Sequence, residues 1–344
     1  MRKLHILAAA AAMTASSLFA DVQIGKGLSV GGYLDMTYTN VSTDTAGVSA
    51  DTSGFNVATA EIDFSMDFGG GLTAQIDLEG NVGSDGAGGS VEVEQARIDY
   101  GMGQGTLTMG KFDTFIGLEG LEAPDLYQYS NSLTFALEPT QHEGLLYSFD
   151  NGNFNFAFAI VNGITSDNAN STGDNETMSY AAHVGFTPSD ALSFNINYAT
   201  EEADADMTVA NQSVIGGDLL TVDASYTNHG WTVGAEYVSF DRETSTTNGA
   251  ATAVTNADGN ESTAWMLMAN YMFNEQMGAT VRYSTEETEP ALGGANTSET
   301  DEFTFAVSYA VTPNWSALIE YQTMSEDVAK TDTDTIALET ILTF

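Results

Sequence analysis

The sequence predicts an all-β protein, built as a transmembrane antiparallel β-barrel of about sixteen strands. Three observations support this fold class. Apolar and polar residues alternate along segments of about ten residues, as they do on strands with one apolar face. The connections between these segments alternate between short and long, which is typical of outer-membrane barrels. After residue 20, no apolar run approaches the ~18 residues that a membrane-spanning helix needs.

Composition narrows the function classes. The 344 residues include 48 Asp and Glu but only 8 Lys and Arg, which gives a formal charge of −40. Nucleic acid is excluded as a partner, because phosphate binding needs a basic face. The chain has no Cys, which excludes a disulfide scaffold, a zinc–thiolate site and a thiol nucleophile. With 42% hydrophobic and 10% aromatic residues, the chain is too apolar to be disordered.

The N-terminus predicts a secretory signal peptide. A basic pair at 2–3 precedes an apolar stretch at 4–13 and a short segment that ends at Ala20. We expect residues 1–20 to be removed and residues 21–344 to form the barrel domain; a buried N-terminal helix is the alternative. Export of a chain without Cys indicates the envelope of a Gram-negative bacterium, so we expect the barrel in the outer membrane.

The strands follow from the alternation. In FTFAVSYAV at 303–311, the bulky apolar side chains point to one face and the small or polar ones to the other. Near Glu94 the phase changes, which predicts a bulge or a later strand start. All five prolines fall in connections, where they do not interrupt the backbone hydrogen bonds between strands. The predicted strands cover about residues 27–40, 55–68, 72–82, 91–100, 105–111, 141–149, 153–163, 178–187, 191–200, 218–227, 231–241, 262–273, 277–285, 302–311, 315–323 and 334–344.

The connections fall into two classes, which we assign to opposite ends of the barrel. The short ones lie at 69–71, 101–104, 150–152, 188–190, 228–230, 274–276 and 312–314. The long ones lie at 41–54, 83–90, 112–140, 164–177, 201–217, 242–261, 286–301 and 324–333. The third long connection, 112–140, is the longest.

Aromatic residues indicate which face of the strands meets lipid. They begin and end the apolar face of several strands, about six residues apart, as two membrane interfaces require. The pairs are Trp231 and Tyr237, Trp265 and Tyr271, Phe303 and Tyr309, and Trp315 and Tyr321. The apolar face is therefore predicted to contact outer-membrane lipid and the polar face to line water. A secreted sandwich or β-helix is the alternative, because alternation also occurs there.

The last strand predicts how the barrel is assembled. Leu338, Leu342 and the terminal Phe344 share its lipid-facing side. A final strand that ends in Phe resembles the signal read by the barrel assembly machinery of Gram-negative bacteria. We therefore expect Phe344 to act as an assembly signal and this machinery to be a partner.

The segment 110–149 and the FAIVNG sequence at 158–163 resemble the OmpL-like β-barrel porins. A Gly-basic-Phe-Asp strand end, a Glu-Pro-x-x-His element and a Val-Asn-Gly strand end recur in that family in similar order, and here they are Gly110–Asp113, Glu138–His142 and Val161–Gly163. The resemblance covers the whole chain after residue 20 at the level of pattern. It implies channel activity, but brings no agreed catalytic or binding residues.

Sixteen strands and a long third loop also resemble the general diffusion porins. That resemblance implies a homotrimer and a third loop that folds into the lumen and narrows the channel. The charged residues of this loop are all acidic, namely Asp113, Glu119, Glu122, Asp125 and Glu138. Strand parity places Asp35, Glu61, Asp63, Asp77 and Glu79 on the lumen wall, together with Arg97 and Arg282.

We predict a pore constriction in which the acidic third loop faces a few cations. Arg97, Lys111 and Arg282 are the basic residues placed to oppose Asp113, Glu119, Glu122 and Asp125, and such a transverse field sorts solutes by charge. The alternative for Arg97 is a structural pair with Asp99 or Glu61 on the wall.

The sequence predicts neither an enzyme nor a metal or cofactor site. His142, His183 and His229 are scattered, and no Gly-x-Ser-x-Gly elbow occurs. Acidic groups in the loops, such as 201–206 and 286–289, could hold Ca²⁺ or Mg²⁺ or bridge lipopolysaccharide phosphates, but solvated loop charge is the favoured explanation.

The predicted function is therefore a water-filled channel for passive diffusion of small hydrophilic solutes and ions, with a preference for cations. Lipid and lipopolysaccharide would surround it. A structural or adhesive barrel is the alternative, with loops that bind partners or a plugged lumen. Small lumen-facing side chains on the predicted strands 178–187, 191–200 and 302–311 favour the open pore.

Overall fold

The computed structural model describes residues 22–81, 90–164, 178–203, 213–247, 254–290 and 297–344. The predicted signal peptide, residues 1–20, lies outside these ranges, as does part or most of each of five predicted long loops. The described residues contain no helix that is long and apolar enough to cross a membrane.

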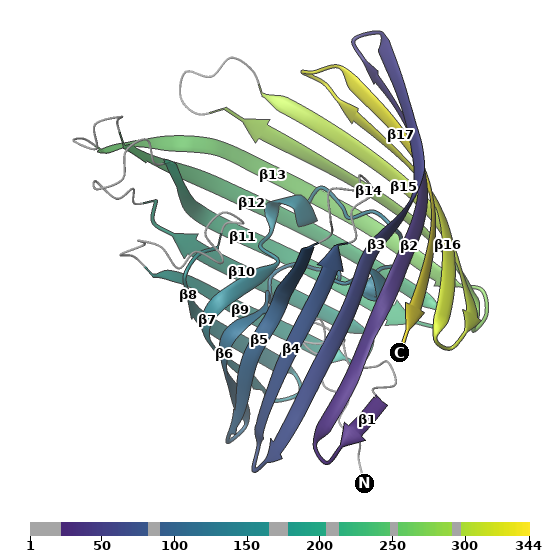
Figure 1. The fold of residues 1–344 in the computed structure, drawn as a ribbon. Helices are drawn as coiled ribbons and strands as arrows, with labels where there is room; N and C mark the ends of the chain where they lie inside the picture. Colours follow the sequence, from purple (N-terminus) through teal and green to yellow (C-terminus); the bar gives the residue numbers. More distant parts are fainter. Residues whose placement is uncertain (1–21, 82–89, 165–177, 204–212, 248–253, 291–296) are drawn as a thin grey trace.

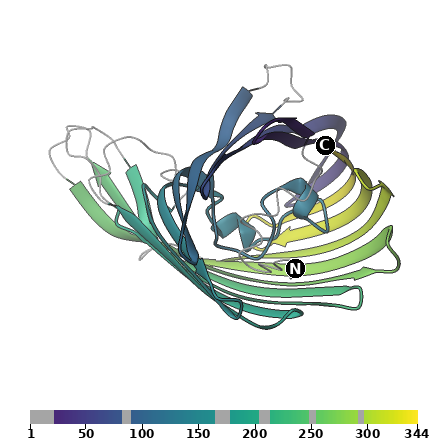
Figure 2. The ribbon, with the colours of Figure 1, turned by 90° about the horizontal axis from the view of Figure 1, so that it is seen from below.

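Sixteen antiparallel strands form one closed ring (Figures 1 and 2). Each strand pairs with the next along the chain, and β17 pairs with β2 from Thr331↔Thr45 to Thr343↔Tyr33, which closes the ring and leaves no open edge. This confirms the predicted fold class. The strands are β2 (Leu28–Thr45), β3 (Val48–Gly69), β4 (Leu72–Asn81), β5 (Ser90–Met102), β6 (Gly105–Asp113), β7 (Gln141–Asp150), β8 (Phe154–Val161), β9 (Ser179–Ser189), β10 (Leu192–Glu201), β11 (Ser213–Asn228), β12 (Trp231–Thr247), β13 (Val254–Met272), β14 (Met277–Glu289), β15 (Ser298–Thr312), β16 (Trp315–Glu326) and β17 (Thr331–Thr343).

An additional short strand, β1 (Val22–Gly25), precedes the ring and was not predicted. It forms a hairpin with the start of β2, where Val22 lies opposite Val30. β17 ends beside Tyr33, and the Phe344 amide donates to the Gly32 carbonyl at 3.0 Å. β1 thus covers the part of the β2 edge that the C-terminal strand does not reach.

Several hairpins continue much farther than predicted. Residues 41–54 were expected to be a long loop, but β2 and β3 pair through this region up to a two-residue turn at Ala46 and Gly47. Both turn residues have positive φ, 52° and 86°, as a tight hairpin turn requires. The sequence pattern missed these extensions because their side chains are polar on both faces, whereas backbone pairing needs no apolar face. The predicted loops 242–261, 286–301 and 324–333 are shortened in the same way.

The predicted bulge at Glu94 is confirmed. Asp77 pairs with Gln95 and Leu78 pairs with Val93, so Glu94 is the extra residue of β5. A bulge re-aims the side chain of its extra residue. Here this matters because Glu94 lies close to Glu61 of β3.

The outer face carries the predicted aromatic rows. Trp231 lies opposite Tyr271 and Tyr237 opposite Trp265 across β12 and β13, so the two rows align from strand to strand. The rings of Trp231 and Tyr271 are 4.6 Å apart between centroids. Such rows, set at two levels of an apolar surface, are what the two interfaces of a bilayer favour.

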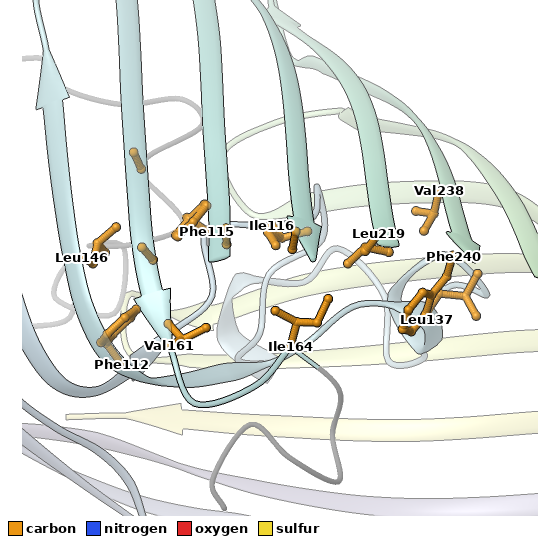
Figure 3. Close-up of a cluster of buried hydrophobic side chains, with 14 of the residues drawn as sticks. Phe112, Phe115, Ile116, Leu137, Leu146, Val161, Ile164, Leu219, Val238 and Phe240 are labelled. Carbon is orange, nitrogen blue, oxygen red and sulfur yellow. The ribbon is translucent and has the colours of Figure 1, made fainter. Parts of the chain in front are cut away.

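A buried apolar cluster lies inside the ring (Figure 3). Phe112, Phe115, Ile116 and Leu137 come from the end of β6 and the segment that follows it, and pack with inward-facing residues of β7 to β13. The wall supplies Leu146, Ala157, Ala159, Val161, Ala181, Ala199, Leu219, Val238, Phe240 and Ala264. Ala181 and Ala199, on two of the strands whose small side chains favour an open pore, are buried in this cluster, so no water space adjoins these two positions.

Candidate pore constriction

The segment between β6 and β7, residues 114–140, which we call the third loop, is surrounded by the ring of strands in Figure 2. It bonds to strands far apart in the sequence. The Tyr127 carbonyl accepts from the Thr280 hydroxyl at 2.9 Å, and the Tyr129 amide donates to Glu320 at 2.7 Å. The Thr134 hydroxyl donates to Glu236 at 2.7 Å. The third loop is therefore tied to β12, β14 and β16 by polar contacts, in addition to the apolar cluster.

Arg282 of β14 is the central polar anchor of the third loop. Its guanidinium lies 2.7 Å from Glu119 of the loop and 2.6 Å from Glu302 of β15. It also donates to the carbonyls of Ser130 and Asn131, at 2.6 and 2.9 Å. The Arg282 side chain is completely buried, so its charge is neutralised inside a structural network and is not presented to water.

Arg97 and Lys111 were both predicted at the constriction. Arg97 of β5 lies 3.4 Å from Asp99 and donates to Gln75 at 2.7 Å, which is the structural alternative. The prediction for Lys111 is wrong. It shares the outer face of β6 with Met109, two residues earlier, and its ammonium group donates to the Val93 carbonyl at 2.9 Å. The physical reason is the two-residue period of a strand, which alternates Lys111 with the inward-facing Phe112.

Acidic residues gather where the third loop meets β2, β3 and β5. Glu122 of the loop accepts a 2.5 Å hydrogen bond from the Tyr33 hydroxyl of β2. One carboxylate oxygen from each of Glu61, Glu94 and Glu122 lies within 4.8 Å of the others. Sequence reasoning placed Glu61 and Glu122 in the interior, but did not bring Glu94 to them. The signal for Glu94 was its position at the bulge.

The other predicted wall residues lie around this group. Asp77 is buried and accepts from the amide groups of Gln75 and Gln95, at 2.7 and 2.6 Å. Asp63 pairs across the strands with Asp77, and Glu61 with Glu79, so these carboxylates form two neighbouring rows on β3 and β4. Asp35 of β2 is also buried, and so is Asp113, which was predicted in the third loop at the constriction but lies at the end of β6. The carboxylates of β3 and β4 therefore lie side by side.

Burial changes the protonation of the loop carboxyls. Removal from water raises the pKa of Glu122 to about 7, although the hydrogen bond from Tyr33 opposes the shift. Burial also raises the pKa of Asp125, which ends a short 3₁₀ turn at Ala123–Asp125. Burial and the neighbouring Glu236 carboxyl raise the pKa of Glu138 well above its usual value. The loop thus carries less negative charge near neutral pH than its composition suggests.

The two buried histidines have structural partners. His183 of β9 lies between the side-chain oxygens of Asn197, at 2.6 Å, and Asn155. His142 of β7 is 3.0 Å from the Thr114 hydroxyl and contacts the rings of Phe112 and Phe115. Both rings therefore support the third loop or the wall beside it.

A polar cavity of about 540 Å³ lies next to the short turns. Inward-facing residues of β2 to β5 line it, including Ser29, Ser65, Thr73, Gln75 and Arg97. Gln23 of β1 forms part of the same lining. These side chains offer hydroxyl, amide and guanidinium groups, so the cavity suits water and small polar solutes.

This architecture also occurs in known proteins. The family model "Putative beta-barrel porin-2, OmpL-like" matches residues 27–344. The outer membrane channel DcaP of Acinetobacter baumannii is similar with a TM-score of 0.68 and 13% identity, over 94% of this chain and 100% of that one. The anion-selective porin from Comamonas acidovorans gives 0.63 and 14%, over 92% and 99%. The trimer form of in-vitro folded OmpT from Vibrio cholerae gives 0.58 and 14%, over 93% and 100%. The curated proteins include no match to the sequence.

The structural likenesses, at such low identity, show the fold alone. The match to the family model shows family membership as well as fold, because it spans all sixteen strands of the ring and the third loop. The family and the similar structures are porins and channels, not enzymes. The predicted resemblance is confirmed, and the chain belongs to the OmpL-like β-barrel porin family of the bacterial outer membrane.

Proposed function

We propose that the barrel is a water-filled channel for passive diffusion of small hydrophilic solutes and ions, and that it prefers cations. The observation that carries the proposal is the acidic wall of β2 to β5. Asp35, Glu61, Asp63 and Asp77 lie on it, joined by Glu94 at the bulge. Acidic groups along a wide pore attract cations and repel anions.

The basic residues do little to offset this wall. Arg282 is neutralised by Glu119 and Glu302 in its buried network. Arg97 pairs with Asp99, and Lys111 lies on the outer face. The wall therefore carries more carboxyl groups than basic groups that could neutralise them.

Similar folds occur with the opposite selectivity, as the anion-selective porin from Comamonas acidovorans shows. The sign of the preference must then come from the inward-facing residues of each chain. For this chain those residues favour cations, because the described interior holds many carboxyls and few basic groups, namely the arginines Arg97, Arg242 and Arg282.

The assembly we propose is a homotrimer surrounded by lipid and lipopolysaccharide. OmpT, a barrel of the same fold, has a trimer form. The exposed apolar outer face, with its aromatic rows, suits lipid. Phe344 ends the strand that closes the ring beside β2 and is our candidate for the signal that the assembly machinery reads.

One observation favours the alternative, a structural barrel with a plugged lumen: the apolar cluster fixes the third loop against β7 to β13. Single-channel recording of refolded protein in a planar bilayer separates the two functions. Discrete conductance steps that grow with salt concentration are expected for the channel. A bilayer that stays silent, although the protein is folded and inserted, would support the plugged barrel instead.

A further inference from the structure

Three carboxylates from distant parts of the chain meet where the third loop touches the wall. Glu61 comes from β3, Glu94 from the bulge of β5 and Glu122 from the loop. Each offers one oxygen, and these oxygens lie within 4.8 Å of one another. Bringing like charges together in the interior is unfavourable unless something compensates them.

The amino-acid side chains nearby compensate these charges only in part: the Tyr33 hydroxyl donates to Glu122, and the ammonium group of Lys111 attracts the Glu94 carboxylate. Glu61 is only 3% exposed, and its Oε2 atom has no hydrogen-bond partner. The Oε2 atom of Glu94 also lacks a partner, whereas its Oε1 accepts from Gln141 at 2.9 Å. The ion pairs of Arg97 and Arg282 use other carboxylates, namely Asp99, Glu119 and Glu302.

A small cavity adjoins two of these carboxylates, Glu61 and Glu122. It has a volume of about 10 Å³ and is lined by Gly32, Tyr33, Glu61, Asp63, Glu122, Pro124 and Asp125. A cavity of this size holds roughly one water-sized sphere. Its lining is rich in oxygen and contains no basic residue.

We propose that Glu61, Glu94 and Glu122 bind one calcium ion, which fastens the third loop to the acidic wall. Ca²⁺ takes oxygen ligands at about 2.3–2.6 Å, so two ligand oxygens on opposite sides of the ion are about 4.8 Å apart. The three carboxylate oxygens all lie within this distance of one another, as ligands of one such ion would. Mg²⁺ demands near-ideal octahedral geometry at about 2.0–2.1 Å, whereas the flexible coordination of Ca²⁺ suits carboxylates that come from two strands and a loop.

The sequence alone predicts no metal site, because these residues are separated by long stretches and match no loop motif. Closure of the barrel brings β3 and β5 within reach of the loop, and the bulge turns Glu94 toward Glu61. The site would act as the counterpart of Arg282: one cation would hold the loop at β14 and another at β3 and β5. This inference concerns ion binding and loop anchoring, and does not depend on channel activity.

The test is calcium binding to the full chain without its signal peptide, refolded in detergent and freed of metal with EDTA. CaCl₂ is titrated by calorimetry, and Tm is followed in parallel. The unmodified protein and the control Glu287→Gln/Glu289→Gln, which removes two exposed acids of β14, are expected to share one saturable site and a rise in Tm. Glu61→Gln and Glu94→Gln are each expected to weaken binding at that site at least tenfold.

Two results would overturn the proposal. The first is equal calcium binding by Glu61→Gln, Glu94→Gln and the control, which would place all binding in surface acids. The second is no calcium effect on the unmodified protein, which would mean that protons neutralise the three carboxyls. An equal response to MgCl₂ would contradict the choice of calcium. Because two single variants are used, a folding defect in one leaves the other to decide.

Discussion

The guanidinium of Arg282 on β14 lies 2.7 Å from the carboxylate of Glu119 in the third loop, and both side chains are buried. The two residues are 163 positions apart in the chain. Their contact, together with Glu302 on the other side of the guanidinium, joins the third loop to the barrel wall. The position of the loop therefore depends on a charge network as well as on apolar packing.

Removal of this arginine is expected to destabilise the protein strongly. Arg282→Ala leaves Glu119 and Glu302 buried without their counter-charge, and breaking such a network costs about 3–5 kcal/mol. Urea unfolding in detergent measures the loss. The control is Arg97→Ala, whose partly exposed pair with Asp99 is expected to contribute no more than about 1 kcal/mol. Equal losses for the two variants would contradict the anchoring role.

The apolar side of the third loop can be tested separately. Phe115 is 4% exposed within the buried cluster, so Phe115→Ala is expected to cost about 3–5 kcal/mol in the free energy of unfolding. Phe55→Ala is the control, because Phe55 is 84% exposed. In single-channel records, Phe115→Ala should also increase conductance or noise as the loop loosens. Unchanged stability would show that the cluster does not hold the loop.

The pH dependence of stability should involve Glu138. Burial raises its pKa in the folded state above its value in the unfolded chain, so the folded state binds this proton more tightly. Its stabilising contribution is complete below the unfolded pKa near 4.5 and is lost as pH rises through the folded pKa. As the pH rises above 5, the Tm of Glu138→Gln is expected to fall less than the Tm of the unmodified protein. A fall as steep as that of the unmodified protein would rule out Glu138 as the cause.

The C-terminal residue should matter more for assembly than a loop segment. Deletion of Phe344 removes the end of the strand that closes the ring on β2, where its amide bonds to Gly32. Deletion of residues 248–251, in the predicted loop 242–261, is the comparison. The amount of folded protein in the outer membrane is the measurement. Similar yields for the two deletions would argue against an assembly signal at Phe344.

The ring of strands was predictable from sequence because a membrane barrel repeats one local rule, the two-residue alternation. That rule also placed Asp77 and Arg282 inward correctly. It predicts Lys111 on the outer face beside Met109, so the error there came from assigning a role by charge and nearness to the loop. Glu119 and Arg282 could not be matched from sequence, because local periodicity says nothing about which loop residue meets which strand. The long polar hairpins, such as that around Ala46, were missed since they carry no apolar face.

Selectivity depends on which acids face the water path. Glu119 is already neutralised by Arg282, so Glu119→Gln should change ion preference little. The combined variant Asp35→Asn/Asp63→Asn/Asp77→Asn removes wall charge and should reduce cation preference. If instead Glu122→Gln/Asp125→Asn has the larger effect, the loop sets the filter.

The most direct test of the central claim is the reversal potential of the unmodified channel in a planar bilayer under a KCl gradient. The acidic wall predicts a potential with the sign of cation preference. Because wide aqueous pores screen charge over about 8–10 Å at physiological salt, the preference should be modest there and grow on dilution. A reversal potential with the sign of chloride preference, at low as well as high salt, would contradict the account.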